Sequence, residues 1–141
     1  KYPLDNQWLE QLNYGNLISA EAKSIFASIH SCEWGKTVQI TNHFSLHKIN
    51  ADLSEADISV IGKTDIVYFD AFGPDKQPEM WEPAIFRKIF EQCSDGAVFV
   101  TYSAKGEVRR RLSAAGFTME RLPGPPGKKE MLRGIKNISN L

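Results

Sequence analysis

A short, nearly continuous apolar run at residues 65–70, Asp-Ile-Val-Tyr-Phe-Asp, limits the possible folds more than any other feature of the sequence. A β-rich run of this length is typical of a strand buried in a parallel sheet. A loop of turn-forming residues follows at 71–78, an amphipathic pattern from about Glu79 to Cys93 predicts a helix, and residues 97–101 predict a second buried strand. This order indicates an α/β fold.

The rest of the C-terminal half continues the alternation. We expect Ser103 to cap a helix that runs to Ala115 and ends at Gly116. Residues 117–122 and 130–135 predict two strands. The proline- and glycine-rich loop between them is too short for a crossover, so they should form an antiparallel hairpin, followed by a frayed chain end. The predicted fold is a mostly parallel α/β sheet with a C-terminal antiparallel hairpin.

The first third of the chain has a helical pattern. Ser19 is predicted to be a helix N-cap, and the apolar residues at positions 22, 25, 26 and 29 recur at helical spacing. Residues 37–51 alternate between polar and apolar side chains, which predicts two strands joined by a tight turn. Residues 53–61 predict a short helix that ends at Gly62.

Length and composition fit one globular domain over residues 1–141. The chain is 42% hydrophobic and 24% charged, and its length allows one core without metal or disulfide support. No apolar run approaches the roughly 20 residues of a membrane helix. The two cysteines are far apart, as expected of reduced thiols in a cytoplasmic protein, and the three histidines lack metal-ligand spacing.

Ligands of parallel α/β sheets bind at the carboxyl ends of the strands. Three parts of the sequence should meet there: Asp52, residues 70–78 and residues 101–104. The Asp70 carboxylate either faces a ligand or accepts backbone N–H groups of the loop that follows it. Phe72 is either a core anchor or an exposed ring that holds a planar or cationic group.

Several separated motifs resemble one family and occur in its order. They are KYPL at 1–4, DAFGPDKQPEMW at 70–81, TYSA at 101–104, VRR at 108–110, AGF at 115–117 and PGPPGKKEM at 123–131. Over essentially its whole length the chain resembles the methyltransferase domain of the bacterial MnmC-type enzymes, which modify the wobble uridine of tRNA. Gly73 and Gln77 depart from the family, which more often has Ala or Ser and Asn there.

The resemblance implies a Rossmann-like, S-adenosylmethionine-dependent methyltransferase that acts on the amine of 5-aminomethyl-2-thiouridine. Asp70 matches the aspartate beside that amine and next to the cofactor. Asp52 matches an acidic residue that accepts a hydrogen bond from the adenine amino group, and Leu53 adjoins it. Asp52 can also cap a helix that begins near Leu53. The acceptor substrate is expected to contact Phe72, Pro74 and Tyr102.

The resemblance also implies parts that residues 1–141 do not contain. The family's glycine-rich methionine-binding loop and ribose-binding acid are expected before Lys1, with the first two strands of a sheet of order 3-2-1-4-5-7-6. Without those strands, residues 37–51 either stand apart or pair directly with residues 65–70, and an edge prone to aggregation is exposed. We expect this chain alone to bind S-adenosylmethionine poorly. Some relatives also carry a flavin-dependent oxidoreductase, which has no counterpart in this sequence.

The zero net charge hides an uneven distribution. Residues 1–104 carry 8 basic and 14 acidic side chains, whereas residues 105–141 carry 9 and 3. The resulting basic surface for tRNA phosphates is predicted at Arg109, Arg110, Arg111, Lys128, Lys129 and Arg133. A solvated helix face explains residues 109–111 equally well.

Two further functions fit the sequence. The first is a non-catalytic α/β module that binds RNA or protein and lacks the cofactor loop. The second is a methyltransferase of the same fold that acts on another amine, because fold and cofactor do not fix the acceptor.

Overall fold

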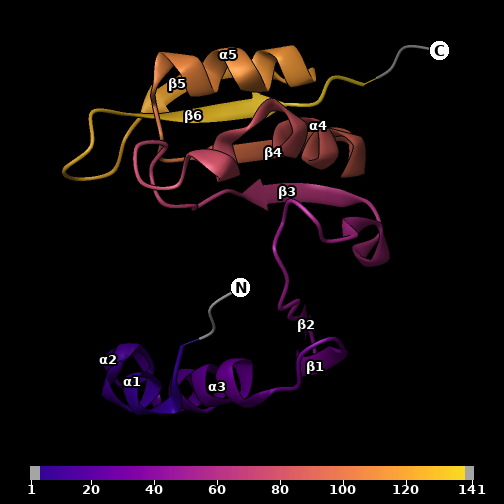
Figure 1. Cartoon of the computed structure of the whole chain (residues 1–141). Helices are drawn as coiled ribbons and strands as arrows, with labels where there is room; N and C mark the ends of the chain where they lie inside the picture. Colours follow the sequence, from indigo (N-terminus) through magenta and orange to yellow (C-terminus); the bar gives the residue numbers. More distant parts are fainter. Residues whose placement is uncertain (1–3, 139–141) are drawn as a thin grey trace. The chain divides into compact units, whose positions relative to one another are not determined.

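The computed structural model describes residues 4–138 (Figure 1). They form two compact units, one ending at Asp52 and one beginning at Leu53, and each is described by itself. The single domain expected over residues 1–141 stays a prediction. Residues 1–3 of the motif at 1–4 and residues 139–141 of the expected frayed end lie outside the described residues.

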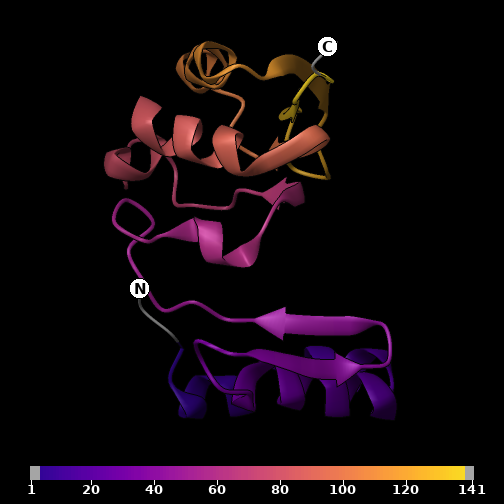
Figure 2. The ribbon, with the colours of Figure 1, turned by 90° about the vertical axis from the view of Figure 1, so that its right-hand side faces the viewer.

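The first unit consists of three helices and a hairpin. Its elements are α1 (Asn6–Gln11), α2 (Tyr14–Ile18), α3 (Ala20–Ser31), β1 (Thr37–Thr41) and β2 (Phe44–His47). The Ser19 hydroxyl accepts a hydrogen bond from the backbone N–H of Ala22 at 3.0 Å, which confirms Ser19 as an N-cap. The two strands run antiparallel, as predicted (Figure 2), and form a sheet of their own instead of pairing with residues 65–70.

The second unit contains a four-stranded sheet. In spatial order its strands are β3 (Thr64–Tyr68), β4 (Cys93–Thr101), β6 (Glu130–Ile135) and β5 (Thr118–Pro123). β3 and β4 are parallel, and β6 runs antiparallel to both β4 and β5. The α/β class and the C-terminal hairpin are confirmed. The order matches the last four positions, 4-5-7-6, of the sheet that the resemblance implies.

Two helices, α4 (Pro83–Gln92) and α5 (Gly106–Ala115), contribute to the core on one face of this sheet. The buried apolar side chains are Phe69, Trp81, Ile85, Phe86, Ile89, Cys93, Ala97, Phe99, Val108, Leu112, Phe117 and Leu132. The pleat of β3 directs Val67 to the core and Ile66 and Tyr68 to the other face. Because Ile66 and Tyr68 are 54% and 79% exposed, the prediction of a fully buried strand is wrong on that face.

The helix predicted from about Glu79 to Cys93 is interrupted. A short 3-10 helix, η2 (Pro78–Trp81), precedes α4, and Glu82 between them is extended, with a ψ of 147°. A residue before proline disfavours the helical conformation, so Pro83 starts a new helix instead of continuing the first.

The start of α5 also differs from the prediction. The backbone N–H of Ser103 donates to Thr101 Oγ1 at 3.3 Å, and Lys105, not Ser103, occupies the N-cap position. The predicted end is confirmed, because Gly116 has a left-handed φ of 118°. A Cβ atom there would also lie 2.6 Å from Phe90 Cζ, so the position requires glycine on two counts.

The helix predicted from residue 53 is shorter than expected. It is a 3-10 helix, η1 (Ile58–Ile61), whose cap is Asp57: the carboxylate accepts a hydrogen bond from Ser59 N at 2.9 Å. Asp52 is therefore not a helix cap, and that alternative is wrong.

Candidate active site

A cavity of about 270 Å³ lies at the carboxyl ends of β3 and β4 in the second unit. Four residues predicted to form the site line it, namely Asp70, Pro74, Tyr102 and Lys128. They come from three loops. Asp70, Tyr102 and Lys128, one from each loop, are separated by 26 to 58 residues along the chain. The structure thus brings together residues that the sequence assigned partly to the acceptor and partly to tRNA.

Asp70 follows β3 at this end of the sheet. It is exposed, and it also lines a second cavity of about 200 Å³ with Tyr68, Val100 and Met131. Among the described residues its carboxylate accepts no hydrogen bond, so the backbone-capping alternative is not observed. The carboxylate is available to a ligand.

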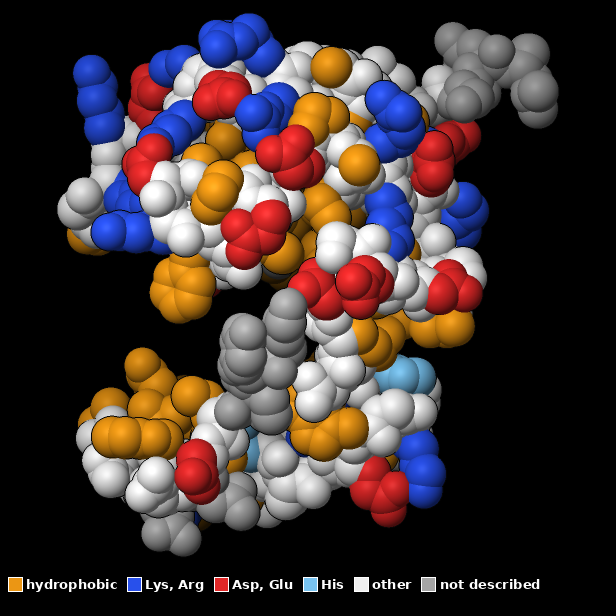
Figure 3. Space-filling model, in the orientation of Figure 1, with side chains coloured by type: hydrophobic (Ala, Val, Ile, Leu, Met, Phe, Trp, Pro, Cys, Tyr) orange, Lys and Arg blue, Asp and Glu red, His pale blue; other side chains and the backbone are white. Residues whose placement is uncertain are grey.

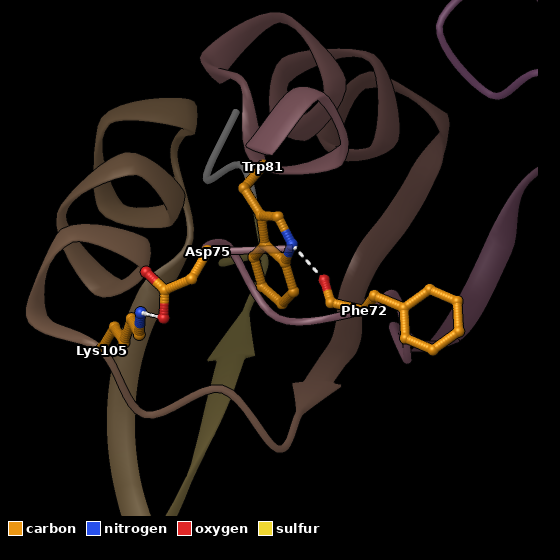
Figure 4. Close-up of polar contacts among 4 residues, drawn as sticks. All are labelled: Phe72, Asp75, Trp81 and Lys105. Carbon is orange, nitrogen blue, oxygen red and sulfur yellow. Dashed lines mark hydrogen bonds and ion pairs between the residues drawn. The ribbon is translucent and has the colours of Figure 1, made fainter. Parts of the chain in front are cut away.

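The loop that follows Asp70 is held in place from two sides (Figure 4). Trp81 Nε1 donates to the Phe72 carbonyl oxygen at 2.8 Å, and the Trp81 ring is buried edge-on against Phe69, with centroids 5.2 Å apart. Lys105, just before α5, forms an ion pair with Asp75. These contacts fix the backbone of the loop beside the cavity.

Phe72 itself points outward. Its ring is 77% exposed and lies on the side of the loop away from Trp81 (Figure 4), so the core-anchor alternative is wrong. Only its carbonyl group takes part in the packing of the loop. An exposed ring two residues from a free carboxylate is suited to contact a cationic or planar group.

Tyr102 and Lys128 also line the cavity of about 270 Å³. Tyr102 is 47% exposed and lines both cavities. Lys128 Nζ lies 3.5 Å from the Tyr102 carbonyl oxygen and 5.9 Å from the centre of its ring. The ammonium group therefore stands over an aromatic face at the edge of the cavity.

The predicted cofactor residues Asp52 and Leu53 fall in different units. Asp52 closes the first unit, and Leu53 opens the second. The Leu53 carbonyl oxygen accepts a hydrogen bond from Lys88 Nζ at 2.9 Å, and its side chain packs against the core. Leu53 also lines a cavity of about 320 Å³ together with Ile66 and Tyr68. Its contact with the cofactor stays a prediction.

The predicted basic surface divides into two kinds of side chain. Arg111 donates to the Trp81 carbonyl oxygen at 2.7 Å and pairs with Glu107, and Arg133 donates to Glu120 at 2.9 Å. Figure 3 shows Lys and Arg side chains over the part of the second unit where α5, β5 and β6 lie. The members of the predicted surface that are exposed and have no ion pair among the described residues are Arg109, Arg110, Lys128 and Lys129.

Two features of the site were not predicted. Asp75 and Lys105 are 30 residues apart, and neither stands in a pattern that pairs them. Thr101 lies in the predicted segment, but its burial and its role as acceptor for Ser103 N depend on the tertiary structure. Within residues 4–138, no helix is long and apolar enough to cross a membrane, and no three acidic, His or Cys side chains group as metal ligands.

An α/β sheet with a free carboxylate at the carboxyl end of a strand agrees with the family comparison. Residues 13–137 match the S-adenosyl-L-methionine-dependent methyltransferase family, and the chain belongs to it.

Named relatives are more specific. The chain is 41% identical over 83 residues to the tRNA 5-methylaminomethyl-2-thiouridine biosynthesis bifunctional protein MnmC of Leptospira borgpetersenii, covering 59% of the chain and 13% of that protein. It is 29% identical over 142 residues to the protein of the same name from Chromohalobacter salexigens, covering 95% and 20%. The chain thus spans a fifth or less of the length of these relatives.

A solved structure supports the fold. The crystal structure of MnmC2 from Aquifex aeolicus aligns with 80% of this chain and 35% of its own, with a TM-score of 0.62 and 23% identity. The Rossmann-like methyltransferase fold is confirmed.

The described residues at the carboxyl ends of β3 and β4 do not by themselves form a complete S-adenosylmethionine site. The two cavities at the sheet edge, of about 200 and 270 Å³, are smaller than the roughly 300–1,000 Å³ usual for such ligands. A Cβ atom at Gly73, the glycine of this edge, would meet nothing within 4 Å, so it forms no close glycine cradle. The described residues instead form a carboxylate-and-aromatic wall suited to an acceptor.

Proposed function

We propose that this chain forms the acceptor side of an S-adenosylmethionine-dependent methyltransferase that methylates an amine on the wobble uridine of tRNA. The observation that carries the proposal is the Asp70 carboxylate, which is exposed beside a cavity and accepts no hydrogen bond among the described residues. Membership of the methyltransferase family and the names of the relatives support the reaction and the substrate.

Asp70 is the residue that orients the amine. A primary amine attacks a methyl group only when its lone pair points along the line of transfer. A carboxylate that accepts an N–H bond fixes that direction and stabilises the positive charge that grows on nitrogen. The Phe72 ring is exposed two residues further along the loop but lines neither cavity, so it is available for a cation–π contact only to a ligand that extends beyond them. S-adenosylmethionine, when bound, supplies the methyl group.

The four exposed basic residues are proposed to hold the RNA. Arg109, Arg110, Lys128 and Lys129 are available for phosphate contacts. Changing Lys128 and Lys129 together to Glu should weaken stem–loop binding. The slope of its salt dependence should fall by about one for each phosphate that is no longer neutralised. Unchanged binding would remove these lysines from the RNA surface.

The amine-recognition test compares two RNA stem–loops, one with 2-thiouridine and one with 5-aminomethyl-2-thiouridine at the wobble position. The wild-type chain should bind the modified RNA about tenfold more tightly, because the added contact is a charge-assisted hydrogen bond. Asp70→Asn should abolish this preference. Asp65→Asn is the matched control, since Asp65 is an exposed carboxylate at the start of β3, the strand that precedes Asp70.

A second candidate is a non-catalytic RNA-binding module, favoured by the poor fit of the described residues to a whole cofactor. It predicts equal affinity for both stem–loops in every variant. Calorimetry with S-adenosylmethionine gives a separate measurement: we expect weak binding to residues 1–141, and tight binding would contradict that expectation.

A further inference from the structure

Three charged side chains line the larger cavity, and two of them have no ion-pair partner among the described residues. Lys105 is neutralised by Asp75, whereas Asp70 and Lys128 are not paired. The cavity therefore offers one negative and one positive group to a ligand. Tyr102, which lines the same cavity, provides an aromatic surface beside them.

Lys128 is placed by a tightly folded loop. The backbone N–H of Gly124 donates to Lys129 O at 3.1 Å, and that of Lys128 donates to Pro125 O at 2.9 Å. A Cβ atom on Gly124 would lie 2.4 Å from Lys128 O, so only glycine lets the loop close this far. From this loop the Lys128 side chain extends to Tyr102, where its Nζ lies 3.5 Å from the carbonyl oxygen.

The neighbouring lysine differs in position. Lys129 is exposed on the same loop but does not line the cavity. The two lysines are therefore not equivalent members of one basic surface: Lys128 lines the larger cavity, and Lys129 does not.

We infer that Lys128 binds a phosphate of the acceptor nucleotide itself, and not a phosphate elsewhere in the RNA. This inference rests on the proposed function. A nucleotide with an aminomethyl group on its base carries both charges that the cavity complements: its amine meets Asp70, and its own phosphate meets Lys128. Tyr102 is then the surface for the base or ribose between them. Lys128 is a specificity-determining residue, whereas Lys129 serves the surrounding RNA.

The test uses four small ligands, measured by calorimetry or by chemical-shift titration with the full chain. They are uridine, 5-aminomethyluridine and the 3′,5′-bisphosphate of each. The bisphosphates should bind about tenfold more tightly than the nucleosides, as a charge-assisted contact predicts. Lys128→Gln should remove this phosphate advantage, and Lys128→Arg should keep most of it. Lys129→Gln should keep it while weakening stem–loop binding. Lys76→Gln, on an exposed residue that does not line the cavity, is the control for a general change in charge.

Two comparisons separate the inference from the proposed function. Bisphosphate against nucleoside tests the phosphate contact of Lys128, and 5-aminomethyluridine against uridine tests the amine contact of Asp70. A phosphate advantage that persists in Lys128→Gln, that falls equally in Lys129→Gln, or that is missing in the wild type overturns the inference. A phosphate advantage that depends on Lys128, found together with equal affinities for uridine and 5-aminomethyluridine, supports the inference and contradicts the amine recognition by Asp70.

Discussion

The two units of the chain differ in how they bury apolar surface. In the second unit, twelve apolar side chains are buried in one cluster, including Phe86, Phe99 and Leu112 at 0% exposure. In the first unit, Gly15 is the buried residue, and no side chain described there is buried. Large apolar side chains such as Leu17 and Ile18 are 73% and 77% exposed. Correct helical periodicity therefore does not by itself produce a core.

The largest expected difference between the units is in hydrogen exchange. Amides of β4 and β6 should exchange only through global unfolding. The free energy of that unfolding is about 5 kcal/mol or more for a unit of this size. Amides of α3 should exchange with far less protection, because few apolar contacts hold that helix. Mass spectrometry of peptides from a time course measures both. Equal protection in the two units would contradict the contrast.

The two cysteines provide a chemical version of the comparison. Cys93 is 1% exposed, and burial raises the pKa of its thiol despite the opposing charges of Lys136 and Lys63. Cys32 in the first unit is only half-buried. A thiol reagent at pH 8 should modify Cys32 in the native protein and Cys93 only on unfolding, because a raised pKa keeps the buried thiol protonated. The Cys32→Ser variant keeps Cys93 as its one thiol, so any modification that is lost in this variant is assigned to Cys32.

Large-to-small substitutions should divide in the same way. Phe99→Ala removes a fully buried ring that packs on Phe69 and Phe117 and should cost about 3–5 kcal/mol of unfolding free energy. Ile18→Ala should cost less than about 0.5 kcal/mol, since that side chain is largely exposed. Denaturant titration measures both, and similar losses would show that burial does not separate the units.

The smallest expected effect is that of the Asp75–Lys105 ion pair. Both side chains are substantially exposed, at 77% and 47%, so a double-mutant cycle with Asp75→Asn and Lys105→Gln should give a coupling energy below about 1 kcal/mol. The coupling should fall with added salt. A coupling above this value would indicate that the pair does more than hold the loop at the edge of the cavity.

Local sequence patterns were sufficient to predict a helix or strand where one face of that element packs against the core. The strand containing Val67, the second strand containing Phe99 and the end of α5 at Gly116 all follow from periodicity or from glycine conformation. The break before Pro83 was not predicted, because the amphipathic pattern continues through that proline. The approach of Lys128 to Tyr102 has no local signal, since these residues meet only when the hairpin returns to β4.

The buried Trp81 has a spectroscopic consequence. Trp8 and Trp34 are 54% and 47% exposed, whereas Trp81 is 1% exposed and lines the larger cavity beside Asp70. A polar quencher such as iodide should suppress the emission of the two exposed indoles and leave a shorter-wavelength band from Trp81. This intrinsic fluorophore then reports ligand entry at the cavity without any label.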